Sequence, residues 1–352
     1  MNSKKMTAME RVLTTLGHQE PDRIPLFINA TLHGSKELGL SIKEYFSKPE
    51  YVIEGQLRMQ QKFKGDSLTG FFYGPAEYEA FGGEVIFYDD GPPNSGRPVI
   101  KNAEDIFSLV PPRISETPCL VKGLEAIQGL KEADKGKTPI VGVAVSPFSL
   151  PVMQMGFEKY IELIYEQKKA FDQLMKINQE FCVNWANAQL SAGAAAICFF
   201  DPVSSATITP RDLYETTGFE VDRQTIARIN GACATHMASG RCLPNLDLIG
   251  KTGTAAIGTS VEEDLSEVKQ RCRGKLSVIG NLNGVEMRNW TIDGTHARVK
   301  EAIFKAGPGG GFILSDNHGE IPFQVPEKII MAISDAVHEW GRYPLTWMEE
   351  YE

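Results

Sequence analysis

The run Ala196-Ile-Cys-Phe-Phe200 is short and apolar, and the acidic residue Asp201 follows it directly. A second run of the same kind, Ala232-Cys-Ala-Thr-His236, comes after one long amphipathic stretch and ends in a histidine. Apolar runs of this length are typical of strands that are buried on both faces of a parallel sheet. The two runs therefore predict parallel strands whose carboxyl ends carry ionisable side chains.

The same alternation of short apolar runs and long amphipathic stretches extends in both directions. Further candidate strands are residues 26–28, 67–72, 139–145, 255–259, 276–280 and 311–315. Candidate helices lie near residues 36–64, 156–192, 211–230, 261–273, 295–306 and 326–341. About eight strands alternating with helices predict an α/β protein of the (β/α)8 TIM-barrel class, which takes about 250 residues.

The residues beyond those of a minimal barrel are expected in two additions. Thr7 and Glu10 have the spacing of a capping box and predict an N-terminal helical extension. Residues 82–100 predict an inserted β-hairpin, with strands at 84–88 and 98–100 on either side of the turn cluster 90–96. Because no linker or low-complexity segment interrupts the chain, residues 1–352 are expected to form a single domain.

Composition excludes several classes of protein. The chain has 352 residues, 42% of them hydrophobic and 23% charged, which is typical of a globular protein. A net charge of -9 argues against nucleic acid as a partner, and no apolar run approaches the roughly 20 residues of a membrane helix. The six cysteines form no C-x-x-C pair, and no secretory signal is evident, so reduced thiols in a cytoplasmic location are expected.

In barrels of this class the active site lies at the carboxyl ends of the strands. The polar and aromatic residues at those positions are Asn29, Phe71, Phe72, Tyr73, Ser146, Asp201, His236, Asn281, Asn283, Asp316 and His318. His236 and Asp201 are the leading catalytic candidates, although a histidine after a strand also often serves as an ordinary hydrogen-bonding residue. Of the aromatic residues, Phe72, Tyr73, Phe148 and Phe200 either line an apolar substrate pocket, with Asn281 and Asn283 as polar contacts, or belong to the barrel core.

Carboxylate and histidine spacing also allows a metal site. Asp201 precedes Glu215 by 14 positions, and Glu215 precedes His236 by 21. Two carboxylates and a histidine suit zinc with one open position, and Cys242 offers a sulfur ligand if its loop folds back. The alternative for Glu215 is a carboxylate that stabilises the start of a helix.

Several short segments, in this order and spacing, make the chain resemble the uroporphyrinogen decarboxylase superfamily, and in particular its corrinoid-dependent methyltransferase branch. They are Thr7-Ala-Met-Glu-Arg-Val-Leu13, Pro21-Asp-Arg-Ile-Pro25, Phe81-Gly-Gly-Glu84, Gly91-Pro-Pro93, Asp201-Pro202, Ile208-Thr-Pro210, Thr235-His-Met-Ala-Ser-Gly240, Gly280-Asn-Leu-Asn283 and Gly310-Gly-Phe-Ile-Leu-Ser-Asp316. The resemblance covers nearly the whole chain and implies a (β/α)8 barrel.

The resemblance also separates the branches of the superfamily. Its decarboxylases have an Arg-Gln-Ala-Gly-Arg-Tyr segment after the first strand, where this chain reads Asn29-Ala-Thr-Leu-His-Gly34 and has no arginine to hold a polycarboxylate. Its thiol methyltransferases bind zinc through His-x-Cys and a late cysteine, but here Ala238 and the segment Asp316-Asn-His318 occupy those places.

First methyltransferases of O-demethylase systems have a Glu-x20-His zinc spacing, which Glu215 and His236 match. The preceding glutamate of that pattern falls on Phe200, so the third ligand stays open between Asp201, Cys242 and His318. The resemblance therefore implies a zinc-dependent methyltransferase that moves a methyl group from a small methylated molecule, such as a methoxy compound, to the cob(I)alamin of a separate corrinoid protein.

Three other functions are compatible with the same fold. The chain could transfer methyl from a methylcorrinoid to a thiol or to tetrahydrofolate, which the two missing cysteines disfavour. It could also be a decarboxylase that acts on a smaller acid, or a barrel without catalytic activity. Zinc content and carbon dioxide release would distinguish these alternatives.

Overall fold

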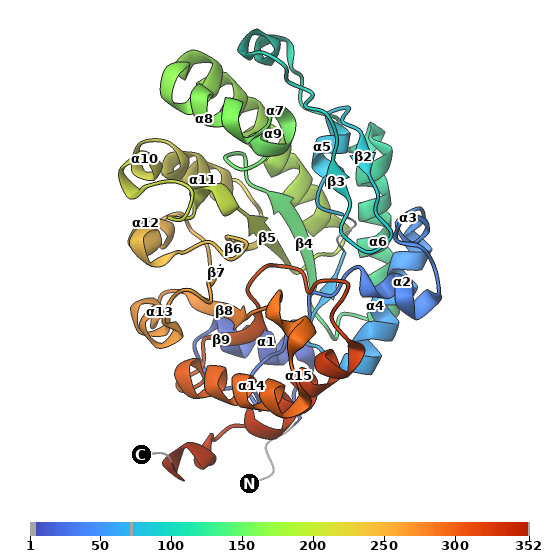
Figure 1. The fold of residues 1–352 in the computed structure, drawn as a ribbon, viewed down its shortest axis with the longest axis vertical. Coiled ribbons are helices and arrows are strands. Elements are labelled where there is room, and N and C mark those ends of the chain that lie inside the picture. Colours follow the sequence, from blue (N-terminus) through green and yellow to red (C-terminus); the bar gives the residue numbers. More distant parts are fainter. Residues whose placement is uncertain (1–4, 71–72, 351–352) are drawn as a thin grey trace.

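The computed structural model describes residues 5–70 and 73–350. Its central feature is one curled sheet of seven parallel strands with helices around the outside (Figure 1). The strands stand side by side in chain order: β1 (Leu68–Thr69), β4 (Ile140–Val145), β5 (Ala196–Phe200), β6 (Ala232–His236), β7 (Ala256–Gly258), β8 (Ser277–Leu282) and β9 (Phe312–Asp316). The predicted α/β class and parallel sheet are confirmed, and all seven carboxyl ends therefore lie at one edge.

The predicted strand at 26–28 appears as a single bridge. Leu26 bridges Leu314 of β9 in parallel, and the Leu26 carbonyl accepts a hydrogen bond of 2.7 Å from the N–H of Asp66, just ahead of β1. Leu26 therefore connects the two outermost strands of the sheet through backbone hydrogen bonds.

Three predicted helices are each divided into shorter ones. Residues 36–64 contain α2 (His33–Leu38), α3 (Ile42–Tyr45) and α4 (Pro49–Phe63), because Gly39 takes a left-handed conformation and Pro49 starts a new helix. The second, 156–192, divides at Gln167 into α8 (Phe157–Glu166) and α9 (Lys168–Ala192). The third, 211–230, divides at Thr217 into α10 (Arg211–Thr216) and α11 (Gly218–Ile226).

The remaining helices cover the outside of the sheet or connect its strands (Figure 1). They are α1 (Ala8–Leu16), α5 (Ala76–Ala80), α6 (Pro118–Asp134), α7 (Pro151–Met155), α12 (Leu246–Ile249), α13 (Leu265–Cys272), α14 (Ile292–Ala306) and α15 (Glu327–Trp340). The capping box at the start of α1 is confirmed, since Glu10 N–H donates to Thr7 Oγ1 and Thr7 N–H donates to Glu10 Oε2. Helix α6 is absent from the predicted elements, although Pro118 in its first turn is a recognised start signal.

Residues 82–100 contain a short antiparallel ladder between β2 (Val85–Ile86) and β3 (Asn94–Ser95). The second strand of this ladder, β3, lies within residues 90–96, which were predicted as the turn, and not at the predicted residues 98–100. Pro98 cannot donate to a ladder, and the N–H of Ile100 instead donates to the carbonyl of Gln154 at 2.9 Å.

A buried ion cluster lies where β1 begins. Asp66 accepts hydrogen bonds of 2.6 Å from both Arg11 and Arg23, and one of 2.9 Å from the N–H of Leu26. Arg11 also pairs with Asp22 at 2.6 Å. These contacts hold α1, the Leu26 segment and β1 together at the amino ends of the strands.

No helix in the described ranges combines the length and hydropathy needed to cross a bilayer. All six cysteines are free thiols, and five of them are buried.

Candidate active site

Three ionisable side chains lie at the carboxyl edge of the sheet. Asp201 directly follows β5, His236 ends β6 and Asp316 ends β9. Strands β5 and β6 are neighbours, and their register pairs Phe200 with His236.

The loop after β9 crosses the edge to reach the end of β6. The carbonyl of Asn317 accepts a hydrogen bond of 2.7 Å from the N–H of Ser239. A Cβ placed on Gly319 would lie 3.2 Å from Cε1 of His236, so this loop passes directly over the histidine ring. Residues that are distant in sequence thus meet around His236.

His236 is buried and has one polar atom free for a ligand. Its ring stacks on that of Phe200, with centroids 6.0 Å apart and planes at 15°. Its Nδ1 accepts a hydrogen bond of 3.1 Å from the N–H of Ala238, while Nε2 has no partner. Burial, together with the nearby His318, lowers the pKa of His236 to about 4. The ring is therefore neutral at pH 7, with its proton on Nε2 as a hydrogen-bond donor.

The turn after β6 holds this geometry. Ala238 and Ser239 both have positive φ angles, 44° and 67°. Non-glycine residues rarely take this conformation, and they do so most often where a functional geometry requires it. Here the turn directs the Ala238 N–H back onto the histidine ring.

Asp316 and Asn317 place further polar atoms at the start of the loop that reaches the end of β6. Asp316 Oδ2 accepts hydrogen bonds from the N–H groups of His318 (2.9 Å) and Gly319 (2.8 Å), and burial raises the pKa of Asp316 to about 6. The side chain of Asn317 is 1% exposed, yet neither of its amide atoms has a partner. Buried polar atoms without partners are uncommon, so these atoms mark a place for a polar ligand.

Asp201 belongs to a fully buried polar network. Its Oδ1 accepts hydrogen bonds of 2.5 Å from the Ser146 hydroxyl and 2.6 Å from the Ser149 hydroxyl. Its Oδ2 has no donor and lies near the carboxyl group of Asp222 in α11, which also accepts hydrogen bonds from Tyr214 and Ser204. Asp201 therefore connects strand ends to α11.

Asp222 is a buried acid that the sequence pattern did not single out. Burial, and then the charge of Asp201, raises the pKa of Asp222 well above its usual value. Oδ1 of Asp222 and Oδ2 of Asp201 are both buried without a donor. The raised pKa of Asp222 favours its protonated form, which has an O–H to donate toward the neighbouring carboxyl group.

The other predicted metal ligands do not gather around His236. Glu215 is exposed near the end of α10, whereas the acidic residue in the first turn of that helix is Asp212. Cys242 is fully buried in an apolar cluster, where its N–H donates to Glu263 and burial raises the pKa of its thiol. Glu215 and Cys242 thus have different surroundings, and their place in one ligand set with His236 stays a prediction.

The described residues do not fit zinc as they stand. They contain no group of three or more histidine, cysteine, aspartate or glutamate side chains that could hold a metal. The Nδ1 of His236 is occupied by the Ala238 N–H, which puts the ring proton on Nε2, whereas a histidine ligand needs a free lone pair. His318 lies near His236; its backbone N–H donates to Asp316, and its ring Nδ1 is buried without a partner.

The predicted substrate-binding residues have different surroundings. Phe200 lies against His236, as expected for a site residue. Tyr73 is buried among Phe46 and Phe87 and donates a hydrogen bond to Glu79. Phe72 lies outside the described residues.

Phe148 and the two asparagines make structural contacts. Phe148 is fully buried against Tyr160 and Phe171, as the core alternative predicted. Asn281 donates to the carbonyl of Ser260 at 3.0 Å, and Asn283 accepts from the N–H of Glu286 at 3.1 Å.

The loop after Leu26 closes the site from the side of β9. The N–H of Ile321 donates to the carbonyl of Asn29 at 2.6 Å, and Thr31 donates to the carboxyl group of Glu320. Leu32 N–H adds a hydrogen bond of 3.2 Å to Glu320, whose pKa burial raises to about 7. Glu320, like Asp222 and Asn317, lacks a sequence signal of its own, because its role depends on a contact across the chain.

Among the residues that the structure describes, no arginine or lysine is buried at this edge. The buried basic side chains of the described ranges are Arg11 and Arg23, and both belong to the ion cluster at the amino ends of the strands. A carboxylate-rich ligand would therefore meet buried acids and no buried cation at the carboxyl edge.

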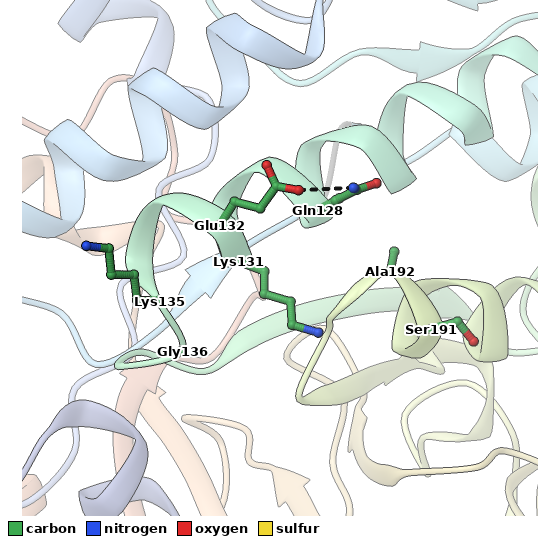
Figure 2. A pocket seen from close by; sticks show the side chains of 7 residues that line it. All are labelled: Gln128, Lys131, Glu132, Lys135, Gly136, Ser191 and Ala192. Carbon is green, nitrogen blue, oxygen red and sulfur yellow. Dashed lines mark hydrogen bonds between the residues drawn. The ribbon is translucent and has the colours of Figure 1, made fainter.

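A surface hollow lies elsewhere. It measures about 630 Å³ and is open to solvent between the C-terminal ends of α6 and α9 (Figure 2). It is lined by Gln128, Lys131, Glu132, Lys135, Gly136, Ser191 and Ala192. Gln128 donates to Glu132, and lysines at a helix C-terminus interact favourably with its dipole. The hollow has no catalytic grouping and lies beside the amino ends of the strands.

A curled parallel sheet with ionisable groups gathered at its carboxyl edge is the arrangement in which α/β enzymes place their active sites. The sequence model of the uroporphyrinogen decarboxylase (URO-D) family matches residues 7–340, and the chain belongs to this family.

Among its curated relatives, uroporphyrinogen decarboxylase of Thioalkalivibrio sulfidiphilus is 24% identical and aligns with 86% of this chain and 87% of its own length. The enzyme of the same name from Carboxydothermus hydrogenoformans is 27% identical and covers 85% of each chain. Among solved structures, a methyltransferase from Methanosarcina mazei has the same fold, with a TM-score of 0.82, 20% identity and coverage of 95% of this chain and 99% of its own.

Proposed function

We propose that this chain is a methyltransferase that moves a methyl group from a small methylated molecule, in the first instance a methoxy compound, to the cob(I)alamin of a separate corrinoid protein. One observation carries the proposal. The carboxyl edge of the sheet holds the neutral ring of His236, the unpartnered amide of Asn317 and several buried acids, while the buried arginines lie at the opposite end. Such a site suits an uncharged ligand better than a porphyrinogen with many carboxylates.

The residues around His236 have defined tasks in this reaction. The Nε2–H of His236 donates to the ether oxygen, and the unpartnered amide of Asn317 is the second polar contact. Both interactions strengthen as the oxygen gains negative charge, so they favour the transition state over the bound substrate. The corrinoid, when its carrier protein is bound, supplies the nucleophile that accepts the methyl group. The Methanosarcina mazei methyltransferase supports this choice of branch through its fold.

Zinc remains a prediction for direct measurement. Metal binding at His236 would require Ala238 N–H to release Nδ1 or the ring proton to leave Nε2. Elemental analysis of the purified protein and of His236→Ala tests whether the protein binds zinc. About one zinc per chain, lost in the variant, would support a zinc-dependent reaction.

We also infer that the sheet closes into an eight-stranded barrel within a single domain, residues 1–352. The Leu26–Leu314 bridge and the hydrogen bond from Asp66 to Leu26 support closure, because they connect the two outer strands. The ladder of β2 and β3 supports the hairpin insertion at 82–100. The six free thiols support a cytoplasmic location.

The test is methyl transfer to chemically reduced cobalamin from a panel of methoxybenzenes that begins with 2-methoxyphenol. Methylcobalamin is quantified by absorbance and mass spectrometry. His236→Gln should lower the rate about 100-fold or more, the usual effect of removing a transition-state donor. The matched control is His338→Gln, because His338 lies on α15 with its Nδ1 beside the Ser334 carbonyl.

A decarboxylase acting on a smaller acid is the second candidate, because the curated relatives carry that name. Carbon dioxide release from mono- and dicarboxylic acids, with no methylcobalamin formed from any methoxy compound, would favour it and refute the methyltransferase proposal.

A further inference from the structure

A small cavity lies between β4, the segment that follows β1, and helices α5, α6 and α9. Its volume is about 20 Å³, enough for one water molecule. It is lined by Gly70, Tyr73, Gly74, Ala76, Glu77, Cys119, Gly123, Val143, Trp185 and Gln189.

The N–H of Gly70, just after β1, donates to the carbonyl of Val141, and farther along β4 two side chains bond to its backbone. The amide group of Gln189 makes two hydrogen bonds to Val143, 2.9 Å to its N–H and 2.8 Å to its carbonyl. Glu77 Oε1 accepts a hydrogen bond of 2.8 Å from the N–H of Val145. Both of these side chains line the cavity.

Among the residues that line the cavity, Glu77 has a side-chain oxygen atom without a hydrogen-bond partner. Its side chain is 4% exposed, and no ion pair to it is present in the described ranges. Its Oε2 has no hydrogen-bond partner, although the indole of Trp185 lies near enough to favour the ionised form. Burial is the larger effect and raises the pKa of Glu77 to about 8. At neutral pH the group is therefore a carboxylic acid with an O–H to donate.

Glu77 lies at the same edge as the site described above. Glu77 accepts a hydrogen bond from the N–H of Val145, the last residue of β4. The next residue is Ser146, whose hydroxyl donates to Asp201. Tyr73, a predicted substrate-binding residue, also lines the cavity. The other titratable groups around it are Cys119, whose thiol stays protonated because burial raises its pKa to about 12, and the deeply buried Cys182.

We propose that Glu77 and one water molecule in this cavity form the acid of the site, a neutral carboxyl group that donates a proton through the water to the reacting group. The donor role rests on the proposed methyl transfer. There, the bond between methyl carbon and oxygen breaks, the methyl group goes to cob(I)alamin and the electron pair stays on the oxygen. The proton that neutralises this oxygen comes from the water, which Glu77 reprotonates, and Glu77 regains its proton from solvent.

The first experiment examines the acid without any substrate. Infrared spectra of the whole protein should contain the carbonyl band of a protonated carboxyl group at pH 7. Glu77 should account for the part of this band that disappears with a midpoint near pH 8 and is missing from Glu77→Gln. Glutamine keeps the acceptor for Val145 N–H, so the variant should fold. Glu79→Gln, the same change on the same helix, should keep the band. Absence of a Glu77-dependent band at pH 7 would overturn the proposal.

The second experiment examines the water and the proton transfer. A high-resolution crystal structure should contain one ordered water within hydrogen-bond distance of Glu77 Oε2, and an empty cavity would overturn the water site. With 2-methoxyphenol and reduced cobalamin, Glu77→Gln should lower the rate about 100-fold or more, the usual share of a general acid. The wild-type rate should fall above about pH 8.

The outcomes distinguish failure of this inference from failure of the proposed function. If Glu77→Gln transfers methyl at the wild-type rate from pH 6 to 9, Glu77 is not the donor and this inference fails while the methyltransferase stands. If the wild-type protein transfers methyl from no compound, the proposed function fails, and with it the donor role. The infrared band and the ordered water then still decide whether Glu77 holds a proton and a water.

Discussion

Replacing Asp66 by alanine should destabilise the protein strongly, because one carboxylate accepts four hydrogen bonds from three residues. It pairs with Arg11 and Arg23 at 2.6 Å, with its side chain 2% exposed, and it accepts the Leu26 N–H at 2.9 Å. In Asp66→Ala, Arg23 keeps the Ile24 carbonyl as its partner. Removing one partner from a buried ion pair costs about 3–5 kcal/mol, so we expect a loss of about 4 kcal/mol.

Equilibrium unfolding in urea at pH 7 measures this loss. Unfolding entropy of about 2.1 cal/mol/K per residue sums to about 0.7 kcal/mol/K over 352 residues, so Tm should also fall by about 5 °C. The control is Glu54→Ala, which removes the exposed Arg58–Glu54 pair and should cost less than about 1 kcal/mol. If Asp66→Ala is as mild as the control, the ion cluster does not hold the Leu26 segment in place, and the reasoning is wrong.

Three further changes examine other parts of the structure. Asp222→Ala should cost about 2–3 kcal/mol because it leaves buried hydroxyl partners unpaired, whereas Asp222→Asn can still bond to Asp201 and should cost less; equal losses in urea would refute this contact. Burial lowers the pKa of His33 to about 4, so the folded state binds fewer protons than the unfolded chain, and stability should decline as the pH falls from about 6.5 to about 4. That decline, up to about 3 kcal/mol, should shrink in His33→Gln when urea midpoints are compared at pH 7 and 4.5. Gly34→Ala would put a Cβ 2.2 Å from the Tyr45 hydroxyl, so it should cost about 1–3 kcal/mol in thermal unfolding, and an unchanged Tm would contradict this packing.

The strands were predictable because burial on both faces leaves a clear mark in the sequence. Residues 196–200 and 232–236 were predicted at the bounds that the structure has. Helix breaks were harder to predict, since the break at Gln167 lies within a continuous amphipathic pattern and carries no glycine or proline. The missed helix α6 had a usable signal in Pro118, but its apolar residues are spread over several faces.

The site was predictable only in part, because strand ends are local features and contacts across the sheet are not. His236 and Asp201 follow from the rule that chemistry lies at carboxyl ends. Asp222 and Glu77 lie on helices, and they are important only because folding brings them to Asp201 and Val145. Spacing alone could not place Glu215, since a distance of 21 positions along the chain says nothing about which face of α10 the side chain occupies.

The negative charge of buried carboxyl groups is avoided in different ways at the two ends of the sheet, and this difference favours an uncharged substrate. At the amino end, Asp66 is neutralised by Arg11 and Arg23. At the carboxyl end, burial raises the pKa of Glu77 to about 8 and of Glu320 to about 7, so protons take the place of cations. An anionic ligand there would meet no fixed positive charge from buried side chains and would also oppose ionisation of the acids. A neutral ether would meet donors, and the oxygen left after methyl loss could be protonated where it lies. Release of carbon dioxide from a polycarboxylate at a site with this charge distribution would refute the argument.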